Sequence, residues 1–158
     1  MKVDDVMRRW FERLDIGSRV LEAARLMVFT GQQALPVVEG ARLAGMIAER
    51  DIFDALLRET SRDVYAWGLS GIDPEVLSAY RGLLNRPVAE IMSQKVLTVG
   101  PDTLALRAAG LMRARRIQRL PVVAGDDLLG LVFQSDIHHA MLAAAPRSEG
   151  DPGEPRDT

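Results

Sequence analysis

Hydrophobic and polar positions along the chain follow one pattern twice. In the first half, apolar residues recur at spacings of three and four, as one face of a helix requires: Leu21, Ala24, Met27 and Val28. Ser18 precedes them as a candidate N-terminal cap. Two β-rich runs, 34–38 and 43–48, are separated by a short turn that contains glycine and acidic residues, which predicts a hairpin. A second helix is expected after it, with these residues on one face: Ile52, Ala55 and Leu56.

The second half has the same order. A helix is predicted to start at Asp102-Thr103, and its apolar face contains Leu104, Ala108, Leu111 and Met112. The runs 119–124 and 128–133 predict another hairpin, and a last helix follows with Ile137, Ala140 and Met141 on one face. A strand before the first helix is expected at 96–99, with a weaker counterpart at 11–14. Each half is therefore expected to form strand, helix, strand, strand, helix, an α/β (α+β) arrangement.

The two halves are copies of one unit. Leu35-Pro36-Val37-Val38 recurs 85 positions later as Leu120-Pro121-Val122-Val123, and Asp51 recurs as Asp136. At this single offset residues 3–57 align with residues 88–142 without a gap, and about a third of the positions are identical. The predicted organisation is a first repeat over 1–57, a connector over 58–87 with a helix at about 74–85, a second repeat over 88–145, and a disordered tail over 146–158.

A unit of about 55 residues buries too little surface to be comfortably stable alone. We therefore expect the two copies to pack sheet to sheet about a pseudo-twofold axis and to complete one core. Such a module would have two related clefts between the repeats.

Composition excludes several classes of protein. The chain of 158 residues has 47% hydrophobic and 27% charged residues, which is typical of a globular protein. The net charge of −2 argues against a nucleic-acid binder. The absence of cysteine excludes disulfides and thiol catalysis and suits a reducing cytoplasm. No apolar run approaches the length that spans a bilayer, so no membrane partner is expected.

Taken together, the repeated segments resemble the CBS domain. In the second copy they are Val88–Met92, Thr98-Val99-x-Pro101, Leu120–Val123 and a Gly130-Leu-Val-x-x-x-Asp136 run. The first copy has the same frame, so the chain is similar to a tandem CBS pair. This resemblance implies a regulatory module without catalytic activity, usually a homodimer, that binds AMP, ADP, ATP or S-adenosylmethionine between the repeats and acts on a partner protein.

The resemblance also assigns roles to residues. Asp51 and Asp136 are expected to hold ribose hydroxyls, and the backbone of two pairs is expected to line the base pocket: Pro36-Val37 and Pro121-Val122. Thr98 belongs to the same candidate site. The family has Thr or Ser three residues before the aspartate, to contact a phosphate, but here these positions are Ala48 and Phe133. Neither can donate to a phosphate, and Phe133 is large enough to fill a cleft or to stack on a base.

Simpler interpretations of these residues remain open. An acidic residue in the first turn of a helix, as expected for Asp51 and Asp136, is favoured by the helix dipole in any case. Arg116 and Arg119, with Arg113 and Arg115, either form a solvated face or replace the missing hydroxyl contact to phosphate.

The remaining candidate side chains give little chemistry. His138 and His139 diverge by about 100° on a helix and cannot share one metal ion. Trp10 and Phe11 favour core packing or a dimer contact over base stacking. No catalytic constellation or nucleotide-binding fingerprint is present. The main hypothesis is a sensor of adenosine nucleotides, and the alternative is a ligand-free dimerisation scaffold whose clefts are filled by its own side chains.

Overall fold

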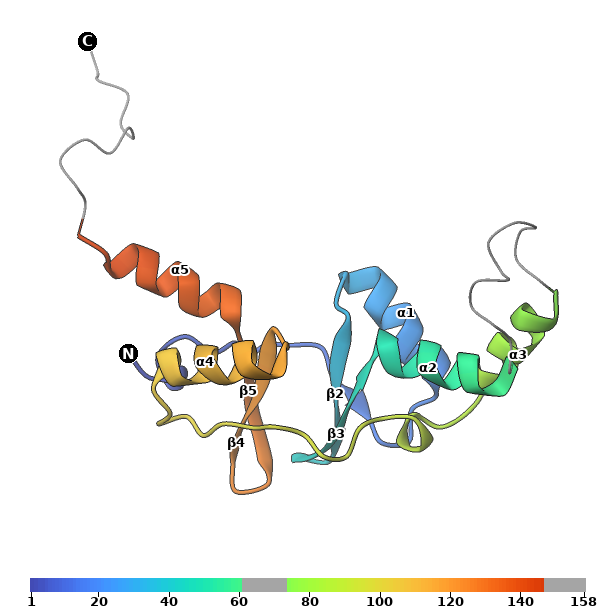
Figure 1. Cartoon of the computed structure of the whole chain (residues 1–158). Helices are drawn as coiled ribbons and strands as arrows, with labels where there is room; N and C mark the ends of the chain where they lie inside the picture. Colours follow the sequence, from blue (N-terminus) through green and yellow to red (C-terminus); the bar gives the residue numbers. More distant parts are fainter. Residues whose placement is uncertain (61–73, 147–158) are drawn as a thin grey trace, which may run out of the picture.

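A computed structural model describes residues 1–60 and 74–146, and both hairpins and all four helices that the repeat pattern predicts are present (Figure 1). The first repeat contains the 3-10 turn η1 (Val3–Asp5), β1 (Leu14–Asp15), α1 (Val20–Thr30), β2 (Ala34–Glu39), β3 (Arg42–Ala48) and α2 (Glu49–Thr60). The second repeat contains η3 (Val88–Glu90), α4 (Ala105–Arg115), β4 (Arg119–Ala124), β5 (Asp127–Phe133) and α5 (Gln134–Ala144).

The leading strand of each repeat differs from the prediction. The stronger candidate, 96–99, forms no strand, because only Val99 pairs with β4, through a parallel bridge to Val122. The weaker candidate, 11–14, overlaps only at Leu14 with the two-residue strand β1, which pairs in parallel with β2. The residue types at 96–99 therefore over-predicted a strand, since strand pairing also depends on how closely the segment approaches its neighbour.

The two hairpins join edge to edge. Five strands form one sheet in the order β1-β2-β3-β5-β4, and β3 meets β5 through the pair Arg42 and Asp127. Each repeat has its own buried cluster, one around Leu35 and Ile47 and one around Leu120 and Val132. The expectation of stacked sheets around a single core was therefore wrong, because the buried faces of the two hairpins are covered by separate pairs of helices (Figure 1).

The leading segments of the two repeats are exchanged. Val3 and Met7 belong to the first repeat in sequence but are buried in the cluster of the second repeat. Val88 and Met92 precede the second repeat and are buried in the cluster of the first. Figure 1 shows the N-terminal segment beginning beside α4 and then crossing to the first repeat. Each core is therefore completed by the other copy, which makes the two repeats one module.

The predicted helix caps were also wrong. Helix α1 starts after Arg19 and α4 after Leu104, and neither start has a side-chain cap. Ser18 instead accepts a backbone hydrogen bond from Val88 (2.9 Å), and Thr103 accepts one from Val3 (2.8 Å). The polar residues that precede each helix therefore anchor the exchanged segments through their backbone carbonyls.

The connector contributes helix α3 (Pro74–Leu84), whose Val76 and Leu83 are buried in the first cluster together with residues of α1 and α2. Residues 147–158 of the expected tail, 146–158, and residues 61–73 of the connector lie outside the described residues. Helix α5 extends away from the body of the molecule (Figure 1), and Ile137 is its only buried residue.

Candidate functional site

The two aspartates occupy equivalent places. Asp51 lies in the first turn of α2, directly after β3, and Asp136 lies in the first turn of α5, directly after β5. Both side chains are partly buried. This placement agrees with the sequence prediction, and the positive end of each helix dipole favours a carboxylate there. The surroundings of the two carboxylates, however, are different.

Asp136 is bound by an arginine that sequence reasoning missed. Arg8 donates from Nε to one carboxylate oxygen (2.9 Å) and from Nη2 to the other (2.6 Å). This two-point geometry is the stronger form of an arginine–carboxylate pair, and the hydrogen bond to Asp136 raises the pKa of Arg8. The signal was present in the repeat alignment, because Arg8 is aligned with Ser93.

Phe133 is the last residue of β5, directly before α5, and lies close to two guanidinium groups. The Cζ atom of Arg8 is 4.4 Å from the centre of the ring, and that of Arg119 is 5.0 Å from it. Both distances are within the range of a cation–π interaction. We call Arg8, Phe133, Arg119 and Asp136 the Asp136 cluster. Of the predicted site residues, the structure thus brings together Phe133, Arg119 and Asp136.

Arg119 also connects the two repeats. Its Nη1 atom donates to the backbone carbonyl of Ala34 (2.7 Å) and to Oε1 of Gln32 (3.2 Å), both in the first repeat. Burial, and secondarily the nearby Arg8, lower the pKa of Arg119. The guanidinium forms no ion pair with a described residue, so the Asp136 cluster contains two cations and one carboxylate.

The equivalent positions around Asp51 carry small side chains. Ser93, Ala48 and Ala34 correspond to Arg8, Phe133 and Arg119, and we call these three with Asp51 the Asp51 cluster. Asp51 accepts a hydrogen bond from the backbone amide of Ala48 (2.8 Å). It forms no ion pair with any residue in 1–60 or 74–146, and burial raises the pKa of its carboxyl group.

The backbone holds Arg8 and Ser93 in corresponding places. Arg8 exchanges two backbone hydrogen bonds with Leu131 of β5 (2.8 and 3.0 Å), and Ser93 exchanges two with Met46 of β3 (2.9 and 2.8 Å). The neighbouring glycines permit this approach, because a Cβ atom on Gly130 would lie 2.7 Å from the Arg8 carbonyl oxygen. A Cβ atom on Gly45 would lie 2.7 Å from the Ser93 carbonyl oxygen.

Other predicted site residues are more dispersed. The pairs Pro36-Val37 and Pro121-Val122 are buried in β2 and β4. Thr98 lines a small cavity of about 150 Å³ between β3 and the turn of the second hairpin. Arg116 ends α4 in a left-handed conformation (φ 54°) and forms no side-chain hydrogen bond or ion pair within the described ranges. The structure therefore does not bring Arg116 into the Asp136 cluster.

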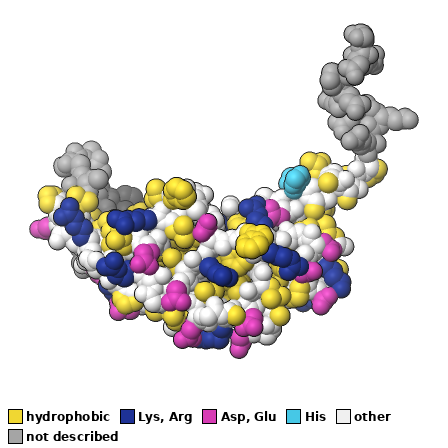
Figure 2. All heavy atoms as spheres, turned by 180° about the vertical axis from the view of Figure 1, so that it is seen from behind, with side chains coloured by type: hydrophobic (Ala, Val, Ile, Leu, Met, Phe, Trp, Pro, Cys, Tyr) yellow, Lys and Arg dark blue, Asp and Glu magenta, His cyan; other side chains and the backbone are white. Residues whose placement is uncertain are grey.

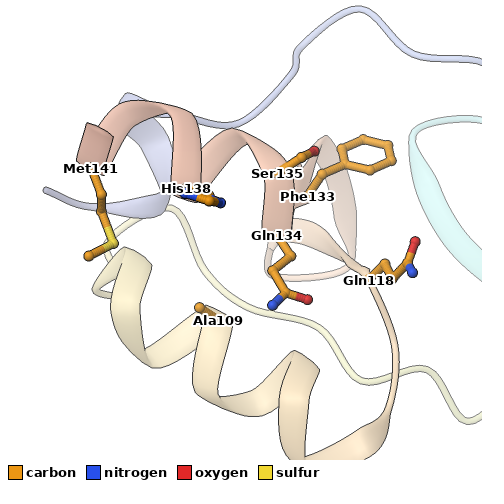
Figure 3. A pocket seen from close by; sticks show the side chains of 7 residues that line it. All are labelled: Ala109, Gln118, Phe133, Gln134, Ser135, His138 and Met141. Atoms are coloured by element: carbon orange, nitrogen blue, oxygen red, sulfur yellow. The ribbon is translucent and has the colours of Figure 1, made fainter. Parts of the chain in front are cut away.

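A larger open cavity of about 490 Å³ was not predicted from the sequence. It lies between α4 and α5 and is lined by Ala109, Gln118, Phe133, Gln134, Ser135, His138 and Met141 (Figure 3). His139 is not among the lining residues, as expected for neighbours on a helix. Figure 3 shows the Phe133 ring directed away from α4, toward the ribbon of the first repeat.

The surface adds two observations. Trp10 is 94% exposed, which excludes core packing, while the alternative of a dimer contact stays a prediction. Basic and acidic side chains are intermixed on the face that Figure 2 shows.

Within the described ranges, no group of three or more His, Cys, Asp or Glu residues is placed to hold a metal ion, and no helix is long and apolar enough to cross a membrane.

Comparison with known proteins gives a consistent result. The CBS domain model matches residues 3–58 and 88–143. The CBS domain-containing protein YhcV of Bacillus subtilis is 31% identical over 135 residues, which cover 85% of this chain and 81% of YhcV. Several other curated relatives are longer proteins, of which this chain spans a third or less.

Solved structures share the fold. CBSX2, solved in complex with AMP, superposes with a TM-score of 0.69 at 23% identity, covering 90% of this chain and 97% of CBSX2. The CBS domain pair of MJ0100, solved with 5-methylthioadenosine and S-adenosyl-L-methionine, gives a TM-score of 0.63 at 21% identity, covering 92% and 98%. With two matched repeats and the arrangement described above, the chain belongs to the CBS domain family and forms one tandem CBS pair.

Proposed function

We propose that this chain is a regulatory module that binds an adenosine nucleotide at the Asp51 cluster. The observation that carries this proposal is the state of Asp51. Its carboxylate is partly buried and forms no ion pair with a described residue, and burial raises its pKa. Arg50 and Arg58 favour the charged form of Asp51, but burial outweighs them, and a bound diol would supply hydrogen bonds to this partly desolvated carboxylate.

The chemistry of the cluster suits a ribose. A carboxylate can accept hydrogen bonds from both hydroxyls of a vicinal diol, and such charge-assisted bonds are strong. Ser93, Ala48 and Ala34 are all short, so none of them reaches far over Asp51. We infer that the base lies against the backbone of Pro36-Val37 or Pro121-Val122, whose side chains are buried in β2 and β4.

Two solved CBS pairs support the ligand class. CBSX2 was solved with AMP, and the MJ0100 pair with 5-methylthioadenosine and S-adenosyl-L-methionine. These three molecules share an adenosine moiety and differ in the group at the 5′ position. We therefore propose the adenosine moiety as the element recognised and keep AMP, ADP, ATP and S-adenosylmethionine as the candidates.

The output of the module is proposed to pass through a homodimer. Large apolar side chains are exposed on the outer helices: Val28 and Phe29 of α1, Phe53 of α2, Leu106 of α4, and Met141 and Leu142 of α5. Phe29 is 89% exposed, which is unusual for phenylalanine in the absence of a partner. A second copy of the chain would cover these side chains, and ligand binding between repeats would change the relative position of the helices that form the contact.

The ligand-free scaffold remains the second candidate because of the Asp136 cluster. There Arg8 occupies both carboxylate oxygens and Phe133 occupies the position at which the family has a hydroxyl. A protein whose own side chains filled both the Asp51 cluster and the Asp136 cluster would dimerise without binding a nucleotide. Whether the Asp51 cluster binds an adenosine compound distinguishes the two candidate functions.

A thermal-shift panel tests the proposal. AMP, ADP, ATP, S-adenosylmethionine and GTP are each added at 1 mM. A ligand present at about 100 times its Kd stabilises the native state by about 2.7 kcal/mol, which for a chain of this size raises Tm by about 5–10 °C. We expect a shift with at least one adenosine compound and none with GTP. Asp51→Asn should abolish the shift, whereas Asp54→Asn, at an exposed position of the same helix, should keep it. A flat panel would favour the scaffold.

A further inference from the structure

We propose that Arg8 is a built-in occupant of the Asp136 cluster, so that the module has one open nucleotide site, at Asp51, and one that its own side chain closes. This inference rests on the proposed function, because it takes the Asp51 cluster and the Asp136 cluster to be two copies of one kind of nucleotide site. It adds a residue that determines how many ligands each chain binds.

The contact between Arg8 and Asp136 uses the atoms that a ligand would need. Nε of Arg8 donates to Oδ2 of Asp136 at 2.9 Å, and Nη2 donates to Oδ1 at 2.6 Å. A ribose diol binds a carboxylate through the same two oxygens, as a two-point donor. Arg8 and a ribose therefore compete for one acceptor, and the arginine is always present at the site.

The arginine is held in this position from two sides. Its backbone is paired with Leu131 of β5 through two hydrogen bonds (2.8 and 3.0 Å), so the side chain always starts from the edge of the second repeat. Its guanidinium then lies 4.4 Å from the centre of the Phe133 ring. In this proposal the ring of Phe133 supports the guanidinium of Arg8, which closes the site at Asp136.

The Asp51 cluster shows what the same geometry does without the arginine. Ser93 has the same backbone pairing, with Met46 of β3 (2.9 and 2.8 Å), but its side chain ends at a hydroxyl one bond beyond Cβ. Ala48 stands in place of Phe133, so no ring is available to support a guanidinium. The two clusters thus differ by side chains at aligned positions on a common backbone. Exchanging these side chains should exchange which cluster is open to a nucleotide.

The contact between Arg8 and Asp136 contributes little to the stability of the fold. The side chain of Arg8 is 52% exposed and that of Asp136 is 19% exposed, so solvent and salt screen the pair. Replacing the arginine should therefore leave the fold intact. Arg9 provides a matched control, because it lies next in sequence and pairs with Asp4 (2.8 Å), outside the Asp136 cluster.

The test is a calorimetric titration of AMP, ATP and S-adenosylmethionine into five proteins. These are the wild type and the variants Asp51→Asn, Arg8→Ser/Phe133→Ala, Asp51→Asn/Arg8→Ser/Phe133→Ala, and Arg9→Ser. The expected numbers of adenosine ligands per chain are about one, zero, two, one and one. Circular dichroism melting of each variant verifies that it is folded.

The outcomes separate this inference from the proposed function. Two sites in the wild type, or a site in Asp51→Asn that Asp136→Asn removes, would show that Arg8 does not close the second end. If the wild type binds nothing, the proposed function fails, but binding by the Asp51→Asn/Arg8→Ser/Phe133→Ala protein would still show that Arg8 and its supporting ring, Phe133, together close the site at Asp136. Absence of binding in that folded triple variant overturns the inference.

Discussion

Asp51 combines two opposing features, since burial raises the pKa of its carboxyl group while a backbone amide stabilises the charge. A raised pKa in the folded state means that the folded protein holds the proton more tightly than the unfolded chain does. The stability that this proton contributes is complete below the unfolded pKa and is lost as pH rises through the folded pKa. At neutral pH the ionised carboxylate therefore opposes folding.

We accordingly expect Asp51→Asn to raise the Tm of the ligand-free protein at pH 7, by roughly 1–3 °C. Asparagine keeps an oxygen that can accept from the amide of Ala48 but carries no charge. The gain should disappear as pH is lowered below the folded pKa, where the native aspartate is protonated as well. Differential scanning calorimetry between pH 3 and pH 8 measures this difference. A lower Tm at pH 7 for the variant would show that the charge of Asp51 stabilises the fold.

Gly45 is required by close packing rather than by backbone conformation. A Cβ atom there would lie 2.7 Å from the carbonyl oxygen of Ser93, a backbone atom that has no free rotation. We expect Gly45→Ala to lower the free energy of unfolding by about 1–3 kcal/mol, as overpacking typically does. Gly110→Ala on α4 is the control, since a Cβ atom there meets nothing within 4 Å, and it should stabilise by about 0.5–1 kcal/mol. Urea unfolding of both variants decides, and equal effects would contradict the packing account.

At the scale of elements, the exchange of leading segments makes each core depend on residues from the other repeat. Met92 is buried in the cluster that contains α1 and β2, and Met7 in the cluster that contains α4 and β4. We expect Met92→Ala to destabilise the protein by about 2–5 kcal/mol. The loss of protection from hydrogen exchange should appear first in α1 and β2, although Met92 precedes the second repeat. Met7→Ala should do the same to α4 and β4.

The opposite pattern, in which each substitution weakens the repeat that it precedes in sequence, would contradict the exchanged arrangement. Uniform loss of protection over both repeats would show that the two cores unfold as one cooperative unit.

The sequence predicted the hairpins, the four repeat helices and the positions of both aspartates, because these depend on local periodicity and on the 85-residue offset. It could not predict the exchange, since Val3 and Val88 have the same local pattern whichever core they enter. The helix faces were also partly misassigned: Val28 is 82% exposed although its spacing placed it on the apolar face. Arg8 was missed because its role depends on a residue 128 positions away, Asp136.

For the whole molecule, the exposed apolar side chains on α1, α2, α4 and α5 predict self-association. We expect the wild type to sediment as a dimer at micromolar concentration and Phe29→Glu to sediment as a monomer, because a charge in an apolar contact has no partner there. Leu77→Glu is the control, since Leu77 is 42% exposed but lies on the connector helix α3. A monomeric wild type in sedimentation equilibrium would remove the dimer from the proposed mechanism.

The most direct test of the central claim is calorimetric titration of AMP, ATP and S-adenosylmethionine, with GTP for comparison, into the wild type, Asp51→Asn and Asp136→Asn. The account predicts that the wild type binds at least one adenosine compound with about one ligand per chain and does not bind GTP. It further predicts that Asp51→Asn abolishes this binding and that Asp136→Asn retains it. Binding that survives Asp51→Asn, or no heat from any adenosine compound, would contradict the claim that this CBS pair recognises adenosine through Asp51.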